Sequence, residues 1–209
     1  MRWPKNALFL ALGLVPASAN AQPANDVLQC VGPFAKDANE ADLKKAFGAA
    51  NVKRVDLDVG EGSTEPGTVV FPNDPKRRIE VLWHDSTKRQ RPSSISIKEK
   101  STWTIAAQPP DQRRIMLGTP LAEVEAINGK PIIVYGFGWD MGGFAGGWEG
   151  GALGQAVGPC SLSLRFDPDP KAKSGTLDKA SGDKPFKSSS PAMRAVKPTV
   201  SSISLGWPE

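Results

Sequence analysis

The chain has one histidine, two cysteines and no long apolar run beyond its first residues. With His84 alone, no multi-histidine metal centre can form, and any Ser–His–Asp or Cys–His arrangement would have to use that one ring. The cysteines are far apart and form no CxxC motif, so zinc or redox chemistry has no sequence support. These absences predict a non-enzymatic protein with no cofactor and no metal site.

The chain also lacks a large excess of either positive or negative charge. The chain has 26 basic and 22 acidic residues, for a net charge of +4. The basic residues form short groups, as at 76–78 and at Arg113 with Arg114, with acidic residues nearby. A nucleic-acid surface needs a denser basic stripe, so we expect no nucleic-acid partner.

The N-terminus does contain the pattern of an export signal. Arg2 and Lys5 precede a short apolar run at 7–15, and small residues then lead to Ala21. This pattern predicts that residues 1–21 are a signal peptide, cleaved after Ala21 to release the chain into the periplasm. A buried N-terminal helix is the alternative. The run is too short to span a bilayer, so no integral membrane segment is expected after cleavage.

Export would place Cys30 and Cys160 in an oxidising compartment, where two cysteines most simply form one disulfide. Closing so long a loop is worth about 4–5 kcal/mol in the chain-entropy description. A metal or redox pair is the alternative, and it lacks partner ligands.

The hydrophobic pattern predicts an α+β fold, with two short helices packed on antiparallel β-sheet. We expect helices at about 40–47 and 120–128, capped by Asn39 and Thr119, with a glycine ending each. Alternating apolar residues predict strands at about 55–59, 68–71, 79–83, 95–97, 103–106, 132–139, 144–148, 160–166 and 199–205.

Residues 22–209 are expected to form one compact domain. Each helix is followed by a glycine stop and a meander ending near a tryptophan, which indicates two sub-modules, at about 36–106 and 114–166. Coincidence explains the likeness equally well. The 199–205 strand would close the domain, and the polar segment 167–190 is expected to be a mobile loop.

Half of residues 136–151 are glycine, which weakens strands and therefore indicates turns, close backbone approach or an adaptable aromatic rim. We expect a β-hairpin that turns at 141–143. Aromatic residues dominate protein contact surfaces and stack on sugars, although they also build cores. The candidate binding residues are Trp139, Asp140, Phe144, Trp148 and Glu149.

Several segments together resemble a family of small secreted (periplasmic) proteins of Gram-negative bacteria, described only as uncharacterised. They are residues 71–83, 136–140, 148–153, 181–183 and 192–201. The resemblance implies export and assigns no catalytic residue. More distantly, residues 117–125 resemble the helix-plus-sheet modules of β-lactamase inhibitor proteins and of a small lipoprotein of the outer-membrane assembly complex. Those modules act by protein–protein contact, which is an analogy at the level of fold.

The sequence thus predicts a non-enzymatic periplasmic binding protein whose partner is a protein or an envelope component. One alternative is an envelope-glycan hydrolase that uses Asp140 and Glu149 as acid and base. Carboxylates beside glycines are also ordinary turn residues. Another alternative is a structural, stress-related protein.

Overall fold

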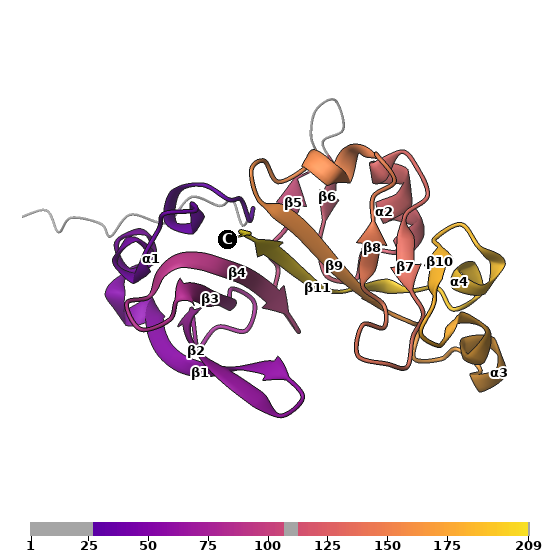
Figure 1. Cartoon of the computed structure of the whole chain (residues 1–209), viewed down its shortest axis with the longest axis horizontal. Coiled ribbons are helices and arrows are strands. Elements are labelled where there is room, and N and C mark those ends of the chain that lie inside the picture. The colour runs from indigo at the N-terminus through magenta and orange to yellow at the C-terminus, as the bar shows by residue number, and fades with distance from the viewer. Residues whose placement is uncertain (1–26, 107–112, 209) are drawn as a thin grey trace, which may run out of the picture.

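The computed structural model describes residues 27–106 and 113–208, so the expected signal peptide lies outside the described residues. Its centre is a six-stranded antiparallel sheet in the order β1-β2-β3-β4-β11-β9 (Figure 1). The strands of this sheet are β1 (Val52–Gly60), β2 (Ser63–Val70), β3 (Ile79–Asp85), β4 (Gln90–Lys98), β9 (Ser161–Asp167) and β11 (Thr199–Gly206). The expected α+β class is confirmed at this level.

The N-terminal lobe consists of β1–β4 and the helix α1 (Glu40–Phe47), which starts and stops as expected. The Asn39 side chain accepts from the backbone N–H groups of Ala41 and Asp42, while Asp42 accepts from the Asn39 N–H. This reciprocal cap satisfies donors that a helix start leaves open. Gly48, at φ 87°, ends the helix. Short 3-10 turns flank it, η1 (Gly32–Phe34) and η2 (Ala49–Asn51).

The second helix, α2 (Leu121–Asn128), differs from expectation at its start. Thr119 does not cap it, because the Thr119 Oγ1 accepts instead from the Met116 N–H at 3.0 Å. Pro120 takes the cap position and makes no side-chain cap. Gly129, in the left-handed region at φ 75°, ends the helix as expected.

The C-terminal lobe gathers α2 with short elements and a three-stranded sheet in the order β10-β7-β8. Its other elements are β7 (Ile133–Tyr135), β8 (Ala145–Gly147), η3 (Ala152–Gln155), α3 (Ser174–Leu177), η4 (Asp178–Ala180), β10 (Pro185–Lys187) and α4 (Pro191–Ala195). A small separate sheet pairs β5 (Ile105–Ala106) with β6 (Arg114–Ile115).

Residues 167–190, expected to be a mobile loop, carry α3, η4 and β10. Strand β10 pairs with β7, and the buried Ser188 bonds Ile132 through both its backbone N–H and its side-chain oxygen. Backbone contacts and a few buried side chains, such as Ala180, therefore hold this polar segment on the lobe, which the scarcity of apolar side chains did not predict.

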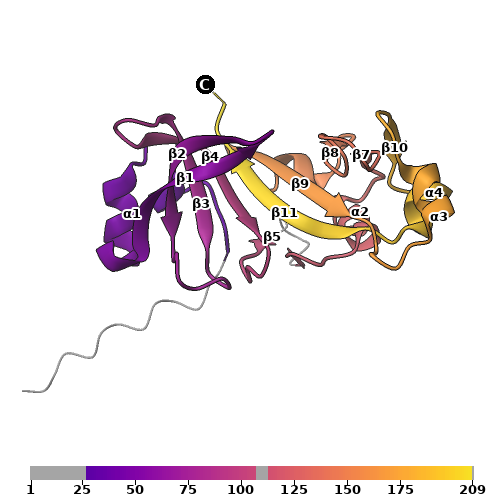
Figure 2. The ribbon, with the colours of Figure 1, turned by 90° about the horizontal axis from the view of Figure 1, so that it is seen from below.

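Strand β11 joins the two lobes. It pairs with β4 on one side and β9 on the other, so the sheet runs through both expected sub-modules (Figure 2). The expected disulfide is present between Cys30 and Cys160, whose Cα atoms lie 6.2 Å apart across 130 residues of sequence. It ties the segment before α1 to the start of β9. No helix among the described residues is long and apolar enough to cross a membrane.

Candidate functional site

The glycine-rich segment forms a hairpin, as expected, but with shorter strands. Strands β7 and β8 are three residues each and pair at only two positions, and residues 136–144 form a loop between them. The strand expected to reach residue 139 ends at Tyr135 because the chain then pairs with another segment. The Gly136 N–H donates to the Lys184 carbonyl, and the Phe137 N–H donates to the Ala180 carbonyl.

Backbone hydrogen bonds hold the 136–144 loop in one shape. The Gly142 N–H donates to the Trp139 carbonyl at 2.8 Å, and the Gly143 N–H donates to the Tyr135 carbonyl at 3.0 Å. The Gly143 carbonyl accepts from the Phe166 N–H of β9 at 2.8 Å. The backbone of the loop is thus fastened to β9, at the edge of the large sheet.

Glycine is required at the point where the loop meets β9. Gly143 has φ 78°, and a Cβ there would lie 2.0 Å from the Phe166 carbonyl oxygen. A Cβ on Gly142 would lie 2.8 Å from the Trp139 carbonyl oxygen. At these two positions glycine therefore serves close backbone approach rather than flexibility.

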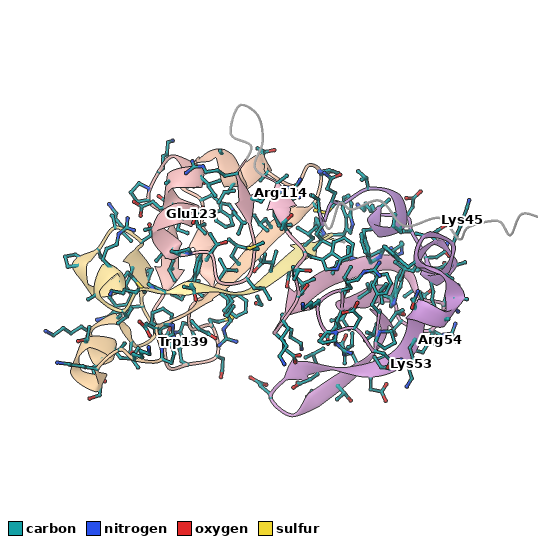
Figure 3. The ribbon with its side chains drawn as sticks, turned by 180° about the vertical axis from the view of Figure 1, so that it is seen from behind. Lys45, Lys53, Arg54, Arg114, Glu123 and Trp139 are labelled. Carbon is teal, nitrogen blue, oxygen red and sulfur yellow. A yellow bond between two sulfur atoms is a disulfide. The ribbon has the colours of Figure 1, made fainter. Side chains whose placement is uncertain are left out.

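The loop holds three of the candidate binding residues, Trp139, Asp140 and Phe144. Trp139 is half-buried, donates its indole N–H to the Gly136 carbonyl at 2.7 Å and meets the Tyr135 ring edge to face (Figure 3). Asp140 is exposed. Phe144 is half-buried, and the Arg165 guanidinium lies over its ring at 5.1 Å.

The other two candidates, Trp148 and Glu149, lie at the opposite end of the hairpin. Trp148 packs against the hydrophobic core, and its carbonyl accepts from the Asn128 side-chain amide at 2.9 Å. Glu149 is exposed, and its carbonyl faces the Lys130 ammonium at 3.4 Å. The strands of the hairpin therefore separate Asp140 from Glu149, an arrangement that does not favour a shared acid–base site.

The sequence reasoning missed the polar side of the large sheet. Directly opposite residues of neighbouring strands share a face. Strands β4, β11 and β9 point one set of side chains into the core and the other set outward, and six of the outward residues are serines. We call this surface the serine face, and it comprises Ser94, Ser96, Ser161, Ser163, Ser202 and Ser204.

The 136–144 loop extends one row of the serine face through Phe144. Phe144 bridges to Arg165, Arg165 lies opposite Ser202, and Ser202 lies opposite Lys98. The next row places Ser163, Ser204 and Ser96 side by side. Adjacent strands are about 4.8 Å apart, so the hydroxyl groups form a regular array.

An open cavity of about 600 Å³ lies at this end of the face. It is lined by Lys98, Glu99, Arg165, Asp167, Ser201 and Ser202. The Arg165 Nε donates to the Gly142 carbonyl at 3.0 Å, and the Lys98 ammonium pairs with Glu80 at 3.0 Å. These contacts fix both cations at the rim of the cavity.

This arrangement offers hydroxyl donors and acceptors, two fixed cations and an aromatic ring. His84 lies elsewhere, with its Nε2 at 2.8 Å from the Trp207 carbonyl oxygen. Within residues 27–106 and 113–208, no three His, Cys, Asp or Glu side chains group closely enough to hold a metal ion.

A signal for the serine face is present in the sequence. Serines alternate with Ile, Leu and Phe at 94–97, 161–166 and 202–205. That alternation predicts three strands with an outward serine row, but only the pairing order brings the rows together.

No protein-family model matches this chain, and no curated protein or solved structure matches it. The resemblance to the secreted family therefore stays a prediction.

Proposed function

We propose that this protein is a non-enzymatic, exported binding protein that holds a component of the bacterial envelope. Its binding surface is the serine face together with the 136–144 loop. The observation that carries the proposal is the row Phe144–Arg165–Ser202–Lys98, which joins an aromatic ring to hydroxyl and cationic groups.

The chemistry of this surface favours a glycan strand as the envelope component. Sugars carry many hydroxyl groups, which serine hydroxyls and Arg165 can hydrogen-bond, and their apolar faces stack on aromatic rings. The open cavity at the loop end suits an extended chain that passes over the sheet. Arg165 is held by the Gly142 carbonyl, so little ordering is needed on binding.

The disulfide and the predicted signal peptide support the envelope as the place of action. The alternative of a protein partner depends on the distant resemblance of residues 117–125 to modules that bind proteins. The aromatic residues of this surface lie on the loop at one end, whereas protein contact surfaces have them at the centre, so we favour the glycan.

Co-sedimentation of the purified protein with peptidoglycan sacculi tests this function. The wild-type protein should sediment with the sacculi, and Ser204→Leu, which inserts an apolar side chain in the middle row, should reduce the bound fraction several-fold. Ser189→Leu is the matched control, because Ser189 is exposed on the C-terminal lobe outside the serine face. Absence of wild-type sedimentation, or an equal loss in both variants, would contradict the proposal.

A further inference from the structure

Strand β1 is a long open edge of the large sheet. It is nine residues long and pairs only with β2 among the described residues. Apart from the Val52 N–H at its start, which donates to the Ala49 carbonyl of η2, no backbone hydrogen bond joins β1 to a described element other than β2. Such an edge is a ready template for pairing with another chain.

The charges on β1 are sorted by sign along the strand. Lys53 and Arg54 come first, and Asp56 and Asp58 follow after the half-buried Val55. All four charged residues are exposed, and Figure 3 shows Lys53 and Arg54 at the outer rim of the N-terminal lobe. An antiparallel copy of the same strand would bring its acidic half beside this basic half.

The sign pattern selects one register. In a two-fold antiparallel pair, the residues directly opposite each other lie on the same face of the sheet. Centring the axis on Arg54, Asp56 or Asp58 places that residue opposite its own copy, with like charges in contact. Centring it on Leu57 places Asp56 opposite Asp58. Centring it on Val55 places Arg54 opposite Asp56 twice and Val55 opposite itself.

We propose that β1 pairs with β1 of a second copy of this chain, antiparallel and about a two-fold axis at Val55. The two large sheets then join edge to edge through backbone hydrogen bonds. Two Arg54–Asp56 pairs flank the central valines and set the register. An isologous contact of this kind closes on itself and gives a dimer rather than a fibre.

The contacts of Arg54 leave it able to make this pair. Its Nε and Nη2 donate to the Glu40 carboxylate, at distances between 2.9 and 3.1 Å. Its side chain is still 61% exposed, and no bond to another described residue engages Nη1. Glu40 therefore holds the guanidinium in place at the edge, while Nη1 is available to Asp56 of the second copy.

Sedimentation and oxidative cross-linking test the dimer and its register. The purified wild-type protein should sediment as a dimer at about 100 μM, where any dimer of micromolar affinity is populated. Val55→Cys should cross-link rapidly through the axis on a non-reducing gel. Asp58→Cys, which lies opposite Val52 in this register, should cross-link much more slowly.

Val55→Lys should give a monomer, because it places two ammonium groups together at the axis. Val59→Lys is the matched control, since residue 59 lies beyond the paired stretch and is already 42% exposed. Circular dichroism verifies that both variants fold. A monomeric wild-type protein, equal cross-linking at 55 and 58, or a Val55→Lys dimer as stable as that of Val59→Lys would overturn the proposal.

Discussion

The two lobes share one sheet but are held together by different means. The N-terminal lobe has strands of seven to nine residues and an ion network around the buried Glu40 of α1. The C-terminal lobe has strands of three residues, fastened by backbone hydrogen bonds between loops. Both lobes contribute side chains to the hydrophobic core, but the second relies more on backbone contacts between its loops. The C-terminal lobe, with the shorter strands, carries the 136–144 loop.

Glu40 is the centre of the ion network in the N-terminal lobe. Its side chain is 7% exposed and accepts from Arg54 and from Lys44, the latter at 2.7 Å. The Arg89 Nε, on a side chain that is 11% exposed, lies 3.6 Å from the Glu40 carboxylate. Burial would raise the pKa of Glu40, but hydrogen bonds from Arg54 and Lys44, together with their charges, lower it to about 2.

The largest effect should come from removing the disulfide that cross-links the two lobes. Replacing both Cys30 and Cys160 with serine should lower the free energy of unfolding by about 2–5 kcal/mol, because the unfolded chain regains the freedom of a long loop. Urea unfolding followed by tryptophan fluorescence measures the change. If the double variant is as stable as the oxidised protein, the disulfide contributes nothing to joining the lobes.

The second test breaks the N-terminal lobe alone. Glu40→Gln should lower the free energy of unfolding by about 1–3 kcal/mol at neutral pH, because the neutral side chain loses the charged hydrogen bonds to Arg54 and Lys44 and leaves the largely buried Arg89 without a carboxylate. Glu65→Gln, at an exposed position on β2, is the control and should change little. Equal stability of the two variants would show that the network does not stabilise this lobe.

The same network gives a pH dependence. The pKa of Glu40 is lower in the folded than in the unfolded state, so its contribution is complete above the ordinary value of 4.5. It is lost as the pH falls from there through about 2. The stability difference between wild type and Glu40→Gln should therefore shrink across this window in acid unfolding curves. A difference that does not change between the two ends would contradict the assigned cause.

The third test concerns the backbone approach in the C-terminal lobe. Gly143→Ala should cost about 1–3 kcal/mol of stability from backbone strain, and it should also displace the loop from β9. Gly158→Ala is a matched control, because Gly158 has nearly the same φ, 81° against 78°, but no atom within 4 Å of the place where the alanine methyl group would lie. The loss at Gly143 should exceed that at Gly158 in thermal unfolding. Equal losses would show that the conformation alone, and not contact with Phe166, requires glycine.

Local patterns predicted the N-terminal lobe well. The helix at 40–47 with its Asn39 cap is present, and so are the disulfide and the strand β11 that join this lobe to the other. Each depends on short-range chemistry or on a pair of unique residues. The predicted two-module repeat stays a prediction.

The C-terminal lobe was harder to predict because distant backbone segments decide it. Strand β7 ends early since residues 180–184 compete for its hydrogen bonds. The polar segment after β9 is held by backbone pairing and by isolated apolar residues, such as Ala180 and Phe186, which form no regular hydrophobic pattern. The serine face arises only when β11 inserts between β4 and β9. Pairing order of this kind is not encoded in any one strand.

The most direct test compares the two ends of the hairpin, since we propose that the 136–144 loop binds the glycan and the end near Trp148 does not. The measurement is the affinity for soluble peptidoglycan fragments, by titration calorimetry, of Trp139→Ala and Trp148→Ala. We predict that Trp139→Ala weakens binding at least about tenfold and Trp148→Ala by less than about twofold, since contact residues dominate binding energy. Equal weakening in the two variants, or unchanged affinity in Trp139→Ala, would contradict the claim.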